Sequence, residues 1–187
     1  MLPRWLPLFL VLIITPLVSA QKPKEISDLT VSPELMNRKL LTISNRQLKL
    51  SDFGNKIIVL NLFADWCGPC VFNLRDLKKL QKEQRRAPIQ VIGVVWKKND
   101  PDVKTVRRFA RQLKIQFPIV YDREDVSGSF AKLVNGLNAI PQTFIIDTDA
   151  RIRKHFQGYN PLSGLQALRD ALDGVVDKQS QKPTPTP

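Results

Sequence analysis

An almost uninterrupted apolar run from Ile57 to Phe63 constrains the fold of this chain more than any other feature. Only Asn61 interrupts it, and such a run is typical of a strand buried on both faces of a sheet. A few residues later the chain enters an amphipathic segment whose apolar side chains recur at helical spacing. The buried face of this predicted helix consists of Val71, Leu74, Leu77 and Leu80. A doubly buried strand followed by a helix is the repeating unit of layered α/β domains.

Further strands and helices alternate along the rest of the chain. Apolar runs predict strands over residues 89–96, 117–121, 143–147 and 152–156, and the last two are expected to form a hairpin. Residues 99–102, Asn-Asp-Pro-Asp, form a helix start signal. The helix that follows is expected to bury Val103, Val106, Phe109, Ala110 and Leu113.

Two more helices are predicted in the second half of the chain. A short one covers residues 126–134 and is closed by Asn135 and Gly136. Asn160 and Pro161 open the last helix. Its buried side chains are expected to be Leu162, Leu165, Leu168 and Leu172.

The order of these elements predicts an α/β fold: a central mixed β-sheet flanked by helices. Short apolar–polar alternations on either side of Asn45, at 40–43 and 48–50, add an N-terminal β-hairpin. We place the folded domain at residues 33–176. Polar, aperiodic residues 21–32 are interpreted as a linker, and residues 177–187, which end Pro-Thr-Pro-Thr-Pro, as a disordered tail.

Residues 1–20 have the layout of a secretory signal. Arg4 precedes an apolar run over residues 6–18, and small residues follow it up to Ala20. Cleavage after Ala20 is the first interpretation, and an uncleaved membrane tether through residues 6–18 is the second. A buried core helix is the third, but nothing before Leu6 would cover it. Either of the first two predicts an exported domain, in the periplasm or an equivalent lumen.

The chain is strongly basic, with 29 Lys and Arg against 17 Asp and Glu, a formal net charge of +12. Such a charge is compatible with an acidic partner, an anionic membrane surface or a nucleic acid. The basic residues, however, are scattered over predicted helices and are not interleaved with aromatic residues. We therefore interpret them as solvated helix faces and expect no nucleic-acid partner.

The two cysteines of the chain, Cys67 and Cys70, lie at the junction between the first buried strand and its helix. A sulfur at a helix N-terminus faces unpaired backbone N–H groups and the positive end of the helix dipole, and both favour the thiolate. Cys67 is expected to be the exposed nucleophile. Cys70, one helical turn later, can attack the mixed disulfide that Cys67 forms, while Gly68 and Pro69 shape the tight turn between them.

Other roles for the two cysteines are weaker. A structural zinc site needs four ligands, whereas the chain offers two cysteines and the single histidine His155, which lies on a separate predicted strand. A disulfide across so short a loop constrains the unfolded chain little, so a purely stabilising role is unfavourable. Two inert buried cysteines remain as an alternative. We expect no metal and no cofactor other than the Cys67–Cys70 pair itself.

Residues 61–70, Asn-Leu-Phe-Ala-Asp-Trp-Cys-Gly-Pro-Cys, resemble the active-site segment of thioredoxins. Together with residues 50–53, 117–122 and 140–147, they are more narrowly similar to the TlpA/ResA-like branch of exported thioredoxins. The similarity covers about residues 35–175, and it implies a thioredoxin fold in which 117–122 belong to an extra strand–helix segment. It also implies that Pro141 is cis and packs beside the cysteines. The backbone of Ile140 would then pair with substrate, and Trp66 would cover one side of the sulfurs.

Two positions depart from the family pattern. Asn61 stands where thioredoxins proper carry a buried aspartate, and Asn73 stands where some relatives carry a glutamate. An amide does not take up a proton near neutral pH, so the proton acceptor for the Cys70 thiol is left open. Asp65 is near in sequence and is expected to be exposed.

The resemblance implies a thiol–disulfide oxidoreductase that acts on disulfides of exported proteins. We expect a reductant, for example in cytochrome c maturation, supplied with electrons by a membrane dithiol donor. The alternatives are an oxidant that installs disulfides and a non-catalytic module that binds extended peptides. A thiol peroxidase would need a peroxidatic cysteine in a different loop context, which the sequence lacks.

Overall fold

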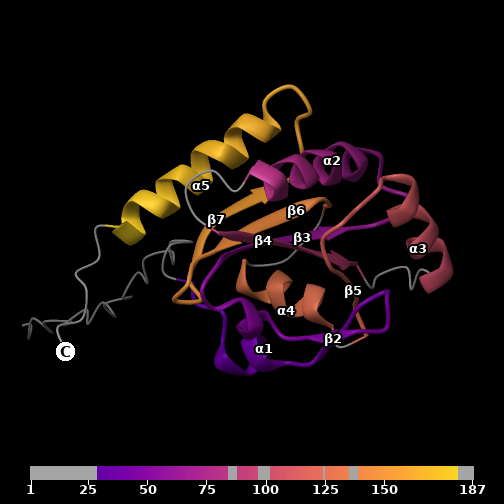
Figure 1. Cartoon of the computed structure of the whole chain (residues 1–187), viewed down its shortest axis with the longest axis horizontal. Coiled ribbons are helices and arrows are strands. Elements are labelled where there is room, and N and C mark those ends of the chain that lie inside the picture. The colour runs from indigo at the N-terminus through magenta and orange to yellow at the C-terminus, as the bar shows by residue number, and fades with distance from the viewer. Residues whose placement is uncertain (1–28, 84–87, 97–101, 124, 135–138, 181–187) are drawn as a thin grey trace, which may run out of the picture.

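The computed structural model describes residues 29–83, 88–96, 102–123, 125–134 and 139–180. Helices and strands alternate through most of this range, as the sequence predicts (Figure 1). The helices are α1 (Pro33–Asn37), the 3-10 helix η2 (Leu50–Phe53), α2 (Gly68–Glu83), α3 (Val103–Gln112), α4 (Val126–Leu133) and α5 (Gly164–Ser180). The strands are β1 (Leu40–Leu41), β2 (Gln47–Leu48), β3 (Ile57–Phe63), β4 (Ile89–Val95), β5 (Ile119–Tyr121), β6 (Gln142–Ile146) and β7 (Ile152–Gln157).

A five-stranded mixed sheet forms the centre of the domain, with strand order β5-β4-β3-β6-β7. Strand β3 runs parallel to β4 and antiparallel to β6. Strand β7, the hairpin partner of β6, lies at one edge of the sheet. Strands β1 and β2 form a separate antiparallel hairpin in which Asn45 adopts a positive φ of 60°. The mixed sheet, the flanking helices and the N-terminal hairpin are therefore confirmed.

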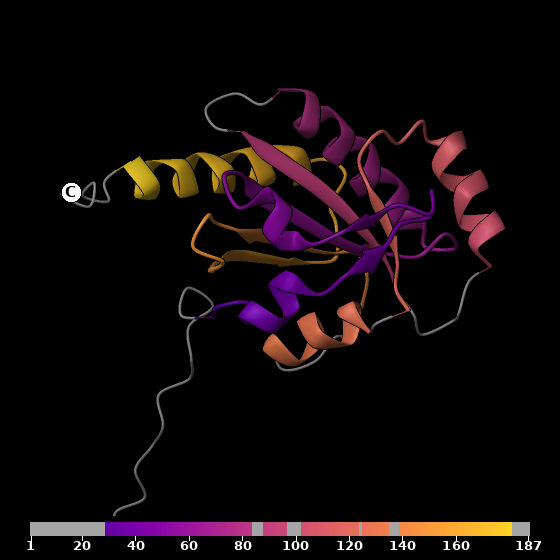
Figure 2. The ribbon, with the colours of Figure 1, turned by 60° about the horizontal axis from the view of Figure 1, so that its bottom comes forward.

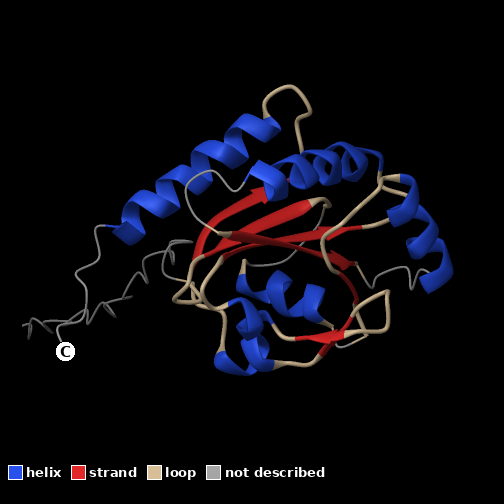
Figure 3. Cartoon of the chain, viewed as in Figure 1, coloured by secondary structure: helices blue, strands red, loops and turns tan. Residues whose placement is uncertain are grey.

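Helices cover both faces of the sheet, which explains why every residue of β3 is buried. Helices α2 and α5 lie over one face, whereas α1 and α4 lie over the other (Figures 2 and 3). Along β3 the side chains alternate between two apolar clusters: Ile57, Val59 and Phe63 face α2, and Ile58, Leu60 and Leu62 face the opposite side. Asn61 is the polar member of the first set, so its amide lies under the helix that carries Cys70.

The last helix begins later than the sequence predicts, at Gly164 instead of Asn160. The side-chain Oδ1 of Asn160 accepts the N–H of Leu162 at 2.9 Å, and the Asn160 carbonyl accepts the N–H of Gly164 at 2.7 Å. These bonds form a separate turn before the helix, and Leu162 within it is 95% exposed. The prediction that Leu162 is buried is therefore wrong, whereas Leu168 and Leu172 are buried as expected.

The boundaries of the folded domain also differ from those predicted. Leu29 and Val31, assigned to the linker, are buried, and Thr30 forms a β-bridge with Arg151. Helix α5 continues to Ser180, past the predicted end of the domain at 176. Residues 1–28, which include the predicted signal or tether, lie outside the described residues, as do residues 181–187 and the predicted helix-end residues Asn135 and Gly136. Among the described helices, none combines the length and the hydropathy that a membrane span requires.

Candidate functional site

Cys67 and Cys70 are joined by a disulfide at the start of α2. The segment between Phe63 and Gly68 is a tight loop, in which the N–H of Cys67 donates to the Ala64 carbonyl at 3.3 Å. Because β3 ends and α2 begins within five residues, the sheet and the helix together hold the first cysteine at the helix mouth.

The backbone of α2 contacts the Cys67 sulfur directly. The N–H of Cys70 lies 3.2 Å from Cys67 Sγ, the arrangement of an N-cap side chain and the third residue of its helix. Pro69 has no N–H to donate, so the Cys70 N–H is the donor that this turn aims at the sulfur. A thiolate at this position would accept the same hydrogen bond and would face the positive end of the helix dipole.

The two sulfur-bearing residues differ in exposure, in the predicted order. Cys67 retains 5% of its surface, whereas Cys70 retains none. The exposure of Cys67 is smaller than expected, because in the disulfide its sulfur is covered by the partner cysteine and by the chain around residue 140. An attacking sulfur would still meet Cys67 first.

The segment around Pro141 lies against Cys67. The Ile140–Pro141 peptide bond is cis, and the Ile140 carbonyl oxygen lies 3.8 Å from Cys67 Sγ. The Pro141 carbonyl accepts the N–H of Gly158 at 2.8 Å, which ties this segment to the end of β7. The peptide bond before Pro141 is cis, as the resemblance implies, whereas the packing of Pro141 beside the cysteines and the pairing of Ile140 with substrate stay predictions.

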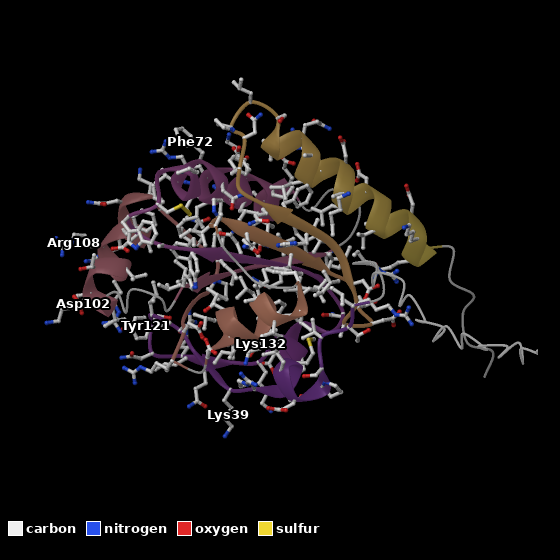
Figure 4. The ribbon with its side chains drawn as sticks, turned by 180° about the vertical axis from the view of Figure 1, so that it is seen from behind. Lys39, Phe72, Asp102, Arg108, Tyr121 and Lys132 are labelled. Atoms are coloured by element: carbon white, nitrogen blue, oxygen red, sulfur yellow. A yellow bond between two sulfur atoms is a disulfide. The ribbon has the colours of Figure 1, made fainter. Side chains whose placement is uncertain are left out.

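Two aromatic side chains near the disulfide are open to solvent. Trp66 is 59% exposed and Phe72 48% exposed, and they belong to the small set of large apolar side chains in the described chain that are exposed. Figure 4 shows Phe72 on the same side of the molecule as the disulfide. Phe72 is not among the site residues that the sequence predicts. The sequence does indicate its exposure, because Phe72 lies outside the apolar stripe of its helix and so cannot pack into the core.

A buried amide pair lies under α2. Asn61 Nδ2 donates to Asn73 Oδ1 at 2.6 Å, to Thr143 Oγ1 at 3.0 Å and to the Gln142 carbonyl at 3.1 Å. Asn61 Oδ1 and Asn73 Nδ2 are buried without a hydrogen-bond partner. Asn73 also lines a cavity of about 210 Å³ below the β7–α5 connection, together with Thr143 and Tyr159. Neither amide supplies a proton acceptor for Cys70.

Two carboxylates near α2 have surroundings that the sequence does not predict. Asp65, expected to be exposed, is half-buried, and its Oδ1 is buried without a hydrogen-bond partner.

Asp76 is buried on α2, where its carboxylate accepts a hydrogen bond from Tyr159 Oη at 2.5 Å and forms an ion pair with Lys79 Nζ at 2.7 Å. Burial, and then the hydrogen bond and charge of Asp76, raise the pKa of Tyr159 well above its ordinary value. Tyr159 therefore stays protonated and links the β7–α5 connection to α2.

His155, the single histidine of the chain, lies apart from the cysteines on β7. Its ring stacks on Phe144 with 4.5 Å between centroids, and its Nε2 lies 2.7 Å from Gln142 Oε1. Burial lowers the pKa of His155 below its ordinary value of 6.5. Within the part of the chain that the structure describes, no three His, Cys, Asp or Glu side chains gather as a metal site would require. A metal-free and cofactor-free site stays a prediction.

Known proteins resemble both the sequence and the fold. The family model described as Redoxin matches residues 25–171. The thiol-disulfide oxidoreductase ResA of Geobacillus thermodenitrificans is 27% identical over 121 residues, which are 64% of this chain and 64% of ResA. The chain thus spans less than two thirds of the length of that relative.

Two solved structures share the fold at low sequence identity. A putative thiol:disulfide interchange protein DsbE from Chlorobium tepidum has a TM-score of 0.63 at 22% identity, over 76% of this chain and 94% of its own. A cysteine-to-serine mutant of peroxiredoxin Q from Xanthomonas campestris has a TM-score of 0.66 at 16% identity, over 80% of this chain and 99% of its own. At such identities the likeness establishes the thioredoxin-like fold and does not distinguish between these two activities.

Proposed function

The chain belongs to the Redoxin family over residues 25–171, and on that basis we propose that it is a thiol–disulfide oxidoreductase that uses Cys67 and Cys70. The observation that carries the proposal is the hydrogen bond from the Cys70 N–H to Cys67 Sγ at the mouth of α2. A helix N-terminus that stabilises a thiolate makes Cys67 both a nucleophile and a good leaving group. The names of the relatives, ResA and DsbE, agree with this chemistry.

The proposed exchange proceeds in two balanced steps. In the dithiol form, the Cys67 thiolate attacks one sulfur of a substrate disulfide, a mixed disulfide forms, and the other substrate sulfur leaves as a thiolate. Cys70 then loses its proton and attacks Cys67 Sγ, so that the Cys67–Cys70 disulfide forms and the second substrate sulfur leaves. Two electrons pass to the substrate, and a dithiol donor must later return them.

We assign the reducing direction to the chain, with protein disulfides outside the cytoplasm as substrates. The Gly68-Pro69 dipeptide resembles that of reducing thioredoxins, and the layout of residues 1–20 favours export. The donor would be a membrane dithiol, and the substrates would include proteins of cytochrome c maturation. The alternative is an oxidant, and the redox potential separates the two. A potential near −270 mV, as for thioredoxin, supports the reductant, and one near −120 mV supports the oxidant.

The central experiment compares the wild type with Cys67→Ser and Cys70→Ser in the reduction of insulin by dithiothreitol. We expect Cys67→Ser to lose the catalysed rate, because it removes the nucleophile. Cys70→Ser keeps Cys67 and should retain substrate proteins as mixed disulfides, which mass spectrometry identifies. Cys67→Ser serves as its matched control, since it has the same polarity and charge but cannot trap. Equal rates for the wild type and Cys67→Ser would instead leave a non-catalytic peptide-binding module.

A further inference from the structure

Half of the net positive charge of the chain lies on two neighbouring helices. Helix α2 carries four basic and two acidic residues, and α3 carries four basic and no acidic ones. Together they have a formal charge of +6, half of the +12 of the whole chain. Helix α5 has a formal charge of −1, and α4, on the opposite face of the sheet, has +1. The scattered basic residues of the sequence thus converge in space.

The exposed basic groups of α3 form a regular stripe. Lys104, Arg108 and Arg111 are exposed and recur at a spacing of four and three residues, on one side of the helix. The opposite side is buried through Val106 and Ala110. Exposed Lys114 follows at the end of the helix, and exposed Arg75 faces solvent from α2. We call Arg75, Lys104, Arg108, Arg111 and Lys114 the basic face.

The basic face borders the disulfide. Helix α3 packs beside the active-site loop through Phe109, whose ring lies 6.1 Å from that of Phe63 at the end of β3. Lys78 of α2 donates to the Leu113 carbonyl at 2.8 Å, which joins α3 to the helix that carries the cysteines. Figure 4 shows Arg108 on the flank of the molecule next to the disulfide. Lys39 and Lys132 lie on the other side of the sheet in the same view.

Acidic groups nearby neutralise little of this charge. Asp76 is enclosed by Tyr159 and Lys79, and Glu83 pairs with Arg169 of α5. Asp102 is exposed at the start of α3. None of the ion pairs found among the described residues involves Arg75, Lys104, Arg108 or Arg111. The basic face therefore presents its charge to whatever approaches the disulfide.

We propose that the basic face is a docking surface for an acidic segment of the protein whose disulfide Cys67 attacks. The inference rests on the proposed function, because that function requires a partner protein to bring a sulfur to Cys67. A partner protein bound in this way would also contact the surface beside the disulfide, where the basic face lies. A membrane seated on the same face would cover the route to the sulfur, so an acidic polypeptide fits better than anionic lipid. Charges at the edge of a contact act mainly on the rate of association.

The test uses three cyclic disulfide peptides that differ only in whether aspartate, serine or lysine residues flank the ring. The kcat/KM for their reduction is measured at about 0.01 M and about 1 M salt, where the Debye length falls from about 30 Å to about 3 Å. Uncharged hydroxyethyl disulfide reports the exchange chemistry alone. The variants are R108E/R111E on the basic face and K39E/K132E as a control with the same change in net charge.

For the wild type we expect the aspartate peptide to be reduced at least about tenfold faster than the serine peptide at low salt, and the lysine peptide more slowly. High salt and R108E/R111E should both abolish the difference, whereas K39E/K132E should keep it. Reduction of hydroxyethyl disulfide should be equal in all three proteins, and circular dichroism should show the same fold.

Four outcomes overturn the inference. Equal rates for the three peptides would show that the basic face selects nothing, and equal losses in both charge variants would assign the effect to net charge alone. If the wild type reduces the three peptides equally fast and binds phosphatidylglycerol vesicles in a way that R108E/R111E removes, the basic face is assigned to a membrane. Failure of the wild type to reduce hydroxyethyl disulfide would overturn the proposed function, and this inference with it.

Discussion

At the scale of single residues, Cys67 and Cys70 have different surroundings although they share one disulfide. Both belong to the apolar cluster under α2, but Cys67 retains 5% of its surface, accepts the Cys70 N–H and lies against the Ile140 carbonyl, whereas Cys70 has no exposed surface. This asymmetry supports the proposed roles, with attack at Cys67 from outside and resolution by Cys70 from inside. Asn61 and Asn73 pair under the helix that carries Cys70, and neither amide can take up a proton near neutral pH.

Asn61→Asp is predicted to supply the missing acceptor at a cost in stability. The new carboxylate would be fully buried and would face the Gln142 carbonyl and Asn73 Oδ1, both acceptors, so its folded pKa should rise above the ordinary value of about 3.9. Stability should then fall as the pH rises through the raised pKa, by about 1–3 kcal/mol at neutral pH. Resolution by Cys70 should become faster and should gain a second ionisation in its pH profile.

Urea unfolding and stopped-flow release of the mixed disulfide, both between pH 5 and 9, measure the two effects. Asn61→Ala is the matched control, since it removes the amide without adding an acid and should show neither a pH-dependent loss nor a faster step. A pH-independent stability of Asn61→Asp would contradict the prediction.

His155 should make the fold less stable in mild acid. Burial holds its folded pKa below 6.5, so the unfolded chain binds more protons as the pH falls below about 6.5. The stability that the neutral imidazole contributes is complete above about pH 6.5 and is lost as the pH falls through the folded pKa. The melting temperatures of the wild type and His155→Gln should therefore diverge between pH 7.5 and 5, because the melting temperature of the wild type falls further as the pH is lowered. Parallel melting curves across this range would refute the effect.

At the scale of elements, the β7–α5 connection departs most from the sequence prediction. The leucine repeat continues upstream of the helix to Leu162, but the bonds of Asn160 form a turn there and leave this side chain in solvent. Figure 1 shows this connection rising above α2, where no described element covers it. Apolar periodicity therefore indicated the helix face correctly but extended it one turn too far.

Two leucine-to-alanine substitutions compare how much a side chain in the turn and one in the helix contribute to stability. Leu162→Ala should change the free energy of unfolding by no more than about 0.5 kcal/mol, because the side chain buries almost nothing. Leu168→Ala, within α5, should cost about 2–5 kcal/mol, since Leu168 is buried in the apolar cluster between the helices and the sheet. Urea denaturation measures both. A loss above about 1.5 kcal/mol for Leu162→Ala would mean that the side chain packs in solution.

The fold was predictable from the sequence to the extent that it depends on local patterns. The fully apolar β3, the hairpin around Asn45 and the buried faces of α2 and α3 follow from periodicity and turn chemistry. The strand ends shifted by one or two residues, as at β5 and β6, because hydrogen bonds with neighbouring strands decide where pairing stops. The start of α5 could not be predicted, since Asn160 and Pro161 open a turn as readily as a helix.

At the scale of the whole molecule, the Cys67–Cys70 disulfide is expected to contribute little to the stability of the fold. The two sulfurs close a loop of only four residues, and two apolar clusters on the two faces of the sheet hold the domain together without it. The chain-entropy relation gives at most about 2 kcal/mol for so short a loop. The dithiol form that the proposed function requires should therefore keep the same fold.

Reduction of the wild type is predicted to lower its free energy of unfolding by no more than about 2 kcal/mol, with the far-ultraviolet circular dichroism unchanged. Urea unfolding with and without dithiothreitol measures this, and the Cys67→Ser/Cys70→Ser double variant, which is insensitive to dithiothreitol, is the control. A loss of about 4 kcal/mol or more on reduction would make the disulfide a structural one.

The sequence by itself determined the α/β fold class and the position of the cysteine pair at the junction between a buried strand and its helix, on which the proposed exchange depends. Each depends on residues close in the chain, and local spacing is visible in the sequence. Only the tertiary structure decided which distant groups meet there: the Ile140 carbonyl at Cys67 Sγ, Asn61 against Asn73, and Phe109 beside Phe63. The convergence of basic charge next to the disulfide is of the same kind, because the packing of α3 against α2 brings those charges together.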